Sequence, residues 1–133
     1  MPTFYSYLLV GVGSALGGMG RHWTTGLVAS RWGSGFPWGT LAVNVAGSLL
    51  IGLLAAGLVP GGRWVLPFAA RELLIVGVLG GYTTFSAFSL QTFMLLEQGH
   101  WLRAGGNVVL SVVLCLAAVA LGYLLATSAL RAG

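Results

Sequence analysis

The chain has 133 residues, of which 57 % are hydrophobic and only 6 % are charged, and its mean hydropathy is +0.94. A soluble domain carries about 25 % charged residues, so this composition excludes a largely water-facing surface. We predict an integral membrane protein made of one domain, residues 1–133, and a net charge of +4 in so apolar a chain does not indicate nucleic-acid binding.

Four apolar stretches are long enough to cross a membrane, which takes about 20 residues. The first is Phe4–Trp23. A cleavable signal peptide has a basic residue before its apolar stretch, and none precedes this one. The others are Trp38–Leu58, Leu73–Leu96 and Ala104–Ala126, separated by segments too short to hold a soluble domain. The sequence therefore predicts an all-α membrane protein with four transmembrane helices.

All basic residues other than histidine are arginine, and they divide equally between the two sides of such a protein. The side that holds both termini and the second loop has Arg63, Arg71 and Arg131, and the other side has Arg21, Arg31 and Arg103. Orientation follows the basic residues of short loops, and here the sides are tied. Two alternatives stay open: the protein inserts both ways up, or the span boundaries and the N-terminal amine decide its orientation.

Along the first span, Gly13, Gly17 and Gly20 recur at helical spacing. Stripes of small residues let membrane helices approach closely, and we interpret this one as packing without a ligand. Four short helices enclose little volume. A pore or a substrate site would therefore require a second copy of the chain.

Polar side chains line one face of two of the apolar spans. They are Thr40, Asn44 and Ser48 in the second span, and Asn107 and Ser111 in the fourth, with Cys115 one turn further. A buried amide in a membrane needs a partner, which an interhelical hydrogen bond can supply. The alternative is that the two faces, with hydroxyls of the third span, line a narrow polar path.

The third span contains the stretch GGYTTF, residues 80–85. Glycine weakens a helix, and hydroxyls can satisfy the backbone groups that a break sets free. We therefore expect a break at Gly80–Gly81, and broken membrane helices commonly hold ions. Phe85 and Phe88 share a face just beyond, where their rings either pack in the core or turn positive edges toward an anion.

The sequence also constrains the charge of a substrate. No carboxylate lies deep in a predicted span, because Glu72 and Glu97 sit at the two ends of the third. A proton-coupled cation carrier would normally need an acidic side chain in mid-membrane. The amides and hydroxyls can all donate hydrogen bonds, which favours a neutral or anionic substrate.

Three motifs give the chain a resemblance to a known family. They are GSALGGMGR at residues 13–21, GTLAVNVAGSLLIG at residues 39–52 and GGYTTFSAF at residues 80–88. Together they resemble the Fluc, or CrcB, family of small bacterial fluoride channels along nearly the whole chain. The sequence departs from the family patterns at Ser14 and Gly18, which keep small side chains, at Ala87, which removes a hydroxyl, and at Gln91, where glutamate is common.

The resemblance implies a dual-topology homodimer of antiparallel four-helix subunits in the bacterial inner membrane. It implies two pores that export fluoride passively and protect the cell from it, so the protein would be a channel and not an enzyme. Its partners would be fluoride, sodium, the lipid bilayer and a second copy, with no nucleic acid.

The resemblance also implies roles for particular residues. Asn44, Phe85, Phe88 and Ser111 match pore residues, with Asn107 one turn from Ser111 and Arg21 near a pore vestibule or a helix end. The backbone carbonyls of Gly80 and Thr83 match the ligands of a structural sodium ion at the dimer interface.

Two other classes of membrane protein stay as alternatives. A small dual-topology multidrug exporter should carry a carboxylate in its first span, and none is present there. A non-transporting assembly subunit would explain the glycine stripe but not the polar faces on three spans.

Overall fold

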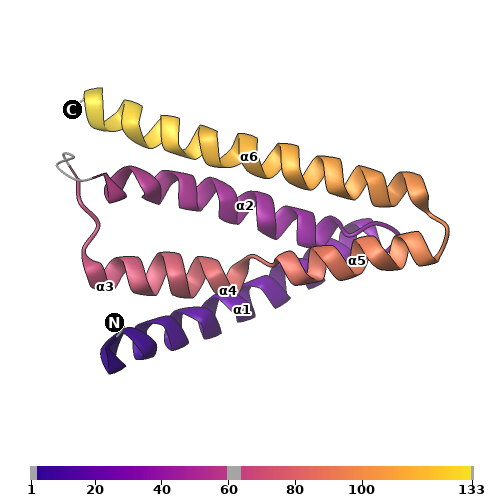
Figure 1. The fold of residues 1–133 in the computed structure, drawn as a ribbon, viewed down its shortest axis with the longest axis horizontal. Coiled ribbons are helices and arrows are strands. Elements are labelled where there is room, and N and C mark those ends of the chain that lie inside the picture. The colour runs from indigo at the N-terminus through magenta and orange to yellow at the C-terminus, as the bar shows by residue number, and fades with distance from the viewer. Residues whose placement is uncertain (1–2, 60–63, 133) are drawn as a thin grey trace.

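The computed structural model describes residues 3–59 and 64–132, and all the regular structure in them is helical. The helices run side by side as an antiparallel bundle, with both ends of the described chain at the same end of the bundle (Figure 1). In chain order they are α1 (Phe4–Trp32), α2 (Trp38–Ala55), the 3-10 turn η1 (Ala56–Leu58), α3 (Phe68–Ala70), the π-helix η2 (Arg71–Leu79), α4 (Gly80–Tyr82), α5 (Phe85–Glu97) and α6 (Trp101–Ala132). The elements α3, η2, α4 and α5 follow one another in nearly one line, which we call the third pass (Figure 1).

Three segments of the described residues are long and apolar enough to cross a membrane. They are Trp38–Leu58, Phe68–Glu97 and Trp101–Ala132, and they correspond to the second, third and fourth predicted spans. The helix α1 has 29 residues but is not among them, because polar side chains such as Arg21 and His22 interrupt its apolar sequence. The all-helical membrane fold is confirmed, and the first predicted span, Phe4–Trp23, stays a prediction.

The first helix runs to Trp32, well past the predicted end at Trp23. Thr24 and Thr25 do not stop it, since each hydroxyl donates to a backbone carbonyl one turn earlier, at 2.9 Å. The helix stops before Gly33, whose φ of +75° is a conformation that glycine adopts without strain. The helix therefore extends beyond the predicted apolar span, whose own bounds in the membrane stay a prediction.

The longer helix changes the account of the arginines, because Arg21 lies inside α1 and not in a loop. Among the described residues, the remaining arginines are Arg31 and Arg103 at one end of the bundle and Arg71 and Arg131 at the other. Arg63 lies outside the described residues. Two of the described arginines therefore lie at each end, and insertion in both orientations stays a prediction.

The predicted glycine stripe packs α1 against the third pass. A β-carbon at Gly17 would collide with the carbonyl oxygen of Val78, and one at Gly13 with that of Leu73. At Gly18 a β-carbon would meet no atom within 4 Å. The interpretation of the stripe as a close-packing surface is confirmed at Gly13 and Gly17.

The helices α2 and α6 pack in the same way. A β-carbon at Gly52 of α2 would collide with the Val119 carbonyl, and one at Gly122 of α6 with the Leu49 carbonyl. This contact holds the polar face of α2 at a fixed height beside that of α6.

The third pass is broken, as predicted, but the break lies three residues later than expected, at Thr83–Thr84 instead of Gly80–Gly81. Helical backbone continues through Gly80 and Gly81 to Tyr82, and the extended residues are Thr83, with φ −86° and ψ 158°, and Thr84, with φ −154° and ψ 120°. Gly81 instead lets the backbone of α1 approach, as a β-carbon there would meet the backbone of Ser14. The glycines serve packing, and the threonines form the break.

The expectation that hydroxyls satisfy the freed backbone groups is confirmed for the Ala87 N–H, whereas the Leu79 carbonyl already accepts the Thr83 N–H at 3.0 Å. The Thr83 hydroxyl donates to the Leu79 carbonyl at 2.9 Å. The Thr84 hydroxyl accepts the N–H of Ala87 at 3.2 Å and so caps α5. Each half of the third pass therefore ends or begins with a side-chain hydrogen bond.

Replacing Gly17 by alanine should destabilise the fold, because the new methyl group has to displace the backbone of η2. Overpacking of this kind costs about 1–3 kcal/mol, and we expect a lower yield of folded protein and a lower unfolding temperature in detergent. The matched control is Gly18→Ala in the same helix, which meets open space. Equal unfolding temperatures for the two variants would contradict the packing described here.

Candidate functional site

Residues from distant parts of the sequence line one pocket of about 500 Å³, which we call the break pocket. It lies between α2, the broken third pass and α6. Its lining includes the predicted pore residues Asn44, Phe85, Phe88 and Ser111, and the predicted sodium ligands Gly80 and Thr83. Of the predicted site residues, only Asn107 and Arg21 are not part of this lining.

Asn44 binds the backbone of the break directly. Its Nδ2 donates to the Thr84 carbonyl at 3.0 Å, and its Oδ1 accepts the Thr84 N–H at 2.8 Å. Thr84 is the N-cap of α5, so its carbonyl can also accept a helical N–H, whereas its own N–H has no helical acceptor and depends on the amide. A primary amide has two N–H groups, so one remains to donate to another group in the pocket. The expected interhelical hydrogen bond and the expected pocket position are both present.

These bonds also leave two carbonyls without their helical donors. In a continuous helix the Gly80 carbonyl would accept the Thr84 N–H, which bonds Asn44 instead. The Thr83 carbonyl would accept the Ala87 N–H, which bonds the Thr84 hydroxyl instead. Both residues line the break pocket. Two such carbonyls are suitable oxygen ligands for a hard cation.

Arg21 approaches the break from α1. Its Nη1 donates to the Thr83 carbonyl at 3.4 Å, a long hydrogen bond. A carbonyl oxygen has two lone pairs, so this bond does not exhaust its capacity. Arg21 therefore brings positive charge to the break without being part of the pocket lining.

The two phenylalanines begin α5 and form a contact pair. Their ring centroids are 5.3 Å apart and the ring planes are inclined by 45°. Phe85 is 78 % exposed and Phe88 is half-buried. A ring as exposed as Phe85 is not packed in the core of its own chain, and its place in a pore stays a prediction.

Asn107 takes part in a chain of hydrogen bonds between α6 and α5. It is 1 % exposed, accepts from the Ser111 hydroxyl at 3.5 Å and donates to the Thr92 hydroxyl at 2.9 Å. Thr92 in turn donates to the Phe88 carbonyl at 2.7 Å. The chain couples the pocket residue Ser111 to the helix that carries both phenylalanines. Sequence analysis missed Thr92, although its place one turn after Phe88 was a signal for it.

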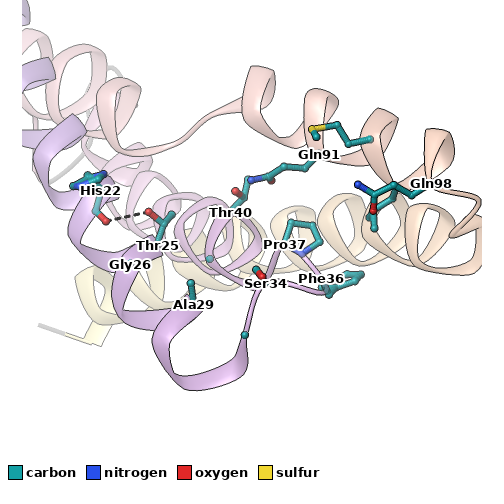
Figure 2. Close-up of a pocket in the computed structure, with 14 residues that line it drawn as sticks. His22, Thr25, Gly26, Ala29, Ser34, Phe36, Pro37, Thr40, Gln91 and Gln98 are labelled. Atoms are coloured by element: carbon teal, nitrogen blue, oxygen red, sulfur yellow. Dashed lines mark hydrogen bonds between the residues drawn. The ribbon is translucent and has the colours of Figure 1, made fainter.

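A second pocket, of about 460 Å³, lies between the C-terminal half of α1, the start of α2 and α5, and we call it the His22 pocket (Figure 2). Thr40 lines this pocket, so the polar face of α2 serves two pockets and not one continuous path. The Gln91 side chain reaches from α5 toward Thr40 (Figure 2). Sequence analysis noted Gln91 only as a departure from a motif and did not consider His22.

The described residues contain no group of three or more histidine, cysteine, aspartate or glutamate side chains that could hold a metal ion. A cation at this site would therefore depend on oxygen ligands such as the two carbonyls at the break.

Comparison with known proteins finds one matching family and several similar proteins that share one name. Residues 8–123 match the family described as CrcB-like protein, Camphor Resistance (CrcB). The fluoride-specific ion channel FluC of Opitutus terrae is 55 % identical over 120 residues, which are 90 % of this chain and 91 % of the relative. The proteins of the same name from Methylocella silvestris and Rhodospirillum rubrum are each 52 % identical, over 92 % and 89 % of this chain and 93 % and 92 % of their own lengths.

We call the two hydrogen bonds between Asn44 and Thr84 the Asn44 clamp. Its contribution to the stability of the fold should be measurable. Asn44→Ala leaves the Thr84 N–H without a partner and removes one donor from the Thr84 carbonyl, at a cost of about 1–3 kcal/mol. We expect a lower unfolding temperature of the purified protein. Ser48→Ala, one turn further in the same pocket, is the matched control and should change the stability by less than about 0.5 kcal/mol. A loss for Asn44→Ala no larger than the control's would show that the clamp does not support the fold.

Proposed function

The chain belongs to the CrcB family, and from this premise we propose that it is a fluoride-specific channel that lets fluoride leave the cell down its gradient. It is a multi-pass bacterial membrane protein and not an enzyme. The observation that carries the proposal is the lining of the break pocket, which combines amide and hydroxyl donors with two aromatic rings and includes no acidic side chain. Family membership decides against the multidrug-exporter and assembly-subunit alternatives.

Fluoride must exchange its water for other hydrogen-bond donors in the pocket. Asn44 retains one N–H beyond its bond to Thr84. The Ser111 hydroxyl can turn toward an ion easily, because its bond to Asn107 is long, at 3.5 Å. Arg21 adds positive potential behind the Thr83 carbonyl. These groups together favour an anion over a cation in the open part of the pocket.

The phenylalanines then supply contacts that do not trap the ion. Ring edges carry partial positive charge, so they attract an anion weakly. Conduction requires an ion to bind well enough to enter and loosely enough to leave. Phe85 and Phe88, at the start of α5, stand beside the donors and offer such weak contacts.

We propose further that α1 also crosses the membrane, which makes four spans, and that two copies of the chain assemble antiparallel. The exposed ring of Phe85 supports this, because a pore residue must be enclosed and one chain leaves it 78 % exposed. The equal number of described arginines at the two ends of the bundle supports insertion in both orientations. The two copies would then build two pores from the same residues.

A structural sodium ion at the centre of this dimer is part of the proposal. The Gly80 and Thr83 carbonyls support it, since both lack their helical donors and both line the break pocket. When bound, the ion would neutralise converging carbonyl dipoles from the two copies.

The role of the phenylalanines is tested by Phe85→Ile and Phe88→Ile. Isoleucine keeps an apolar side chain and removes the ring edge. If the rings only pack, the change costs about 1 kcal/mol and preserves flux per folded protein. We expect instead that folded protein remains while fluoride efflux from liposomes falls by a large factor. Normal efflux from both variants, measured beside the yield on size-exclusion, would remove the rings from the pore.

The sodium proposal predicts a loss of flux when sodium is replaced completely by a large organic cation. The dimer should also loosen, which size-exclusion chromatography detects. Unchanged efflux in sodium-free buffer, together with a high-resolution map that shows no ion between the break carbonyls, would refute it.

Insertion in both orientations predicts that a cysteine added at the C-terminus is labelled from both sides of the membrane in similar amounts. The labelling is done in whole cells with an impermeant reagent, before and after permeabilisation, with the native Cys115 replaced by serine. Labelling from one side alone would mean a single orientation.

A further inference from the structure

Three hydrogen bonds in series run from the break pocket into α5, and all three donors point the same way. The Ser111 hydroxyl, which lines the pocket, donates to Asn107 Oδ1 at 3.5 Å. Asn107 Nδ2 donates to the Thr92 hydroxyl at 2.9 Å, and that hydroxyl donates to the Phe88 carbonyl at 2.7 Å. The hydrogens are therefore directed away from the pocket, although a channel for an anion needs a donor there.

Thr92 fixes the direction of this series. A hydroxyl has one hydrogen and two lone pairs. The Phe88 carbonyl can only accept, so the single hydrogen of Thr92 is used there and the Thr92 oxygen accepts from Asn107. The Asn107 amide must then turn its NH₂ group to Thr92 and its oxygen to Ser111. The two ends of an amide have nearly the same shape, so these hydrogen bonds decide which way the amide lies.

The direction opposes donation from Ser111 to an anion. When Ser111 gives its hydrogen to an ion in the pocket, Asn107 Oδ1 loses that bond. Asn107 is only 1 % exposed, and a buried oxygen without a partner costs free energy. The amide can instead rotate by half a turn, but Thr92 must then give up its bond to Phe88 in order to donate to Oδ1. By either route, donation from Ser111 costs one hydrogen bond elsewhere in the series.

We propose that Thr92 is a positioning residue for conduction. By holding the Asn107 amide with its oxygen toward Ser111, it keeps the contact between Ser111 and fluoride weak enough for the ion to leave. This role rests on the proposed channel function and belongs to a half-buried residue that is not part of the break-pocket lining. Conduction requires an ion to bind well enough to enter and loosely enough to leave, and Thr92 acts on the second requirement.

Removing the Thr92 hydroxyl should release the amide. In Thr92→Val, one end of the Asn107 amide lacks a partner at α5 in either orientation, so Ser111 alone decides how the amide lies. With an anion present, the turned amide donates to the Ser111 oxygen while Ser111 donates to the ion, and hydrogen bonds in series strengthen one another. The cost that Thr92 imposes on ion binding is then absent. One hydrogen bond corresponds to about a 3- to 10-fold change in a dissociation constant.

The test measures the initial rate of fluoride efflux from liposomes over a range of internal fluoride concentrations, per amount of folded protein recovered from size-exclusion. It gives a half-saturating concentration and a maximal rate for the unaltered chain, Thr92→Val, Thr92→Ser, Thr92→Cys and Thr127→Val. Thr127→Val in α6 is the matched control. The Thr127 hydroxyl also donates to a carbonyl one turn earlier, that of Tyr123 at 2.9 Å, and Thr127 is not part of the break-pocket lining.

We expect the half-saturating concentration of Thr92→Val to fall about 3- to 10-fold, because the ion binds more tightly. The maximal rate should fall as well, because the ion leaves more slowly. Thr92→Ser keeps the hydroxyl and should match the unaltered chain, as should Thr127→Val. Thr92→Cys should change in the same direction as valine, since sulfur is a weak donor and acceptor. The cysteine variant keeps the test decisive if the valine variant does not fold.

The results that overturn the role of Thr92 differ from the one that overturns the channel. A half-saturating concentration that stays the same or rises in Thr92→Val, whatever the maximal rate, means that Thr92 only supports the fold. A serine variant that behaves like the valine variant, or the same shift in Thr127→Val, also overturns the role of Thr92. In each of these cases the unaltered chain still conducts, and the proposed channel function stands. Absence of efflux from the unaltered chain overturns the channel function, and the role of Thr92 with it.

Discussion

The two hydrogen bonds between Asn44 and Thr84 are the interaction on which the candidate site depends. A chain that leaves helical geometry at the depth of a membrane must find partners for its backbone groups, since lipid offers none. Asn44 takes the N–H and the carbonyl of the same residue, while the Thr84 hydroxyl caps α5. This arrangement fixes where α5 begins, and hence where Phe85 and Phe88 stand. It also leaves the Gly80 and Thr83 carbonyls without their helical donors. The same bonds therefore position the two aromatic rings and free the two carbonyls.

The clamp can form only because the helices approach closely enough. Gly47, one turn after Val43 on α2, faces the Thr83 side chain so closely that a β-carbon there would collide with its Cγ2. Gly13 and Gly17 bring α1 against η2 in the same way. In a membrane, where apolar surface gains little from burial against other apolar surface, such backbone contacts and a few polar bonds carry much of the packing energy. These glycines thus affect the site by setting the distances between the helices that line it.

The sequence predicts the features that depend on local composition. It misses those that depend on which side chain of another helix bonds a given backbone group. The apolar runs locate the helices, and the spacing of Asn44 and Ser111 correctly puts both side chains in one pocket. The break was expected at the glycines, yet it falls at the threonines, because only Thr84 meets an amide on α2. The division of the α2 polar face between two pockets could not be foreseen either. The start of α5 lines the pocket of Asn44 and its later part lines the pocket of Thr40, and no periodicity within α2 reports the position of another helix.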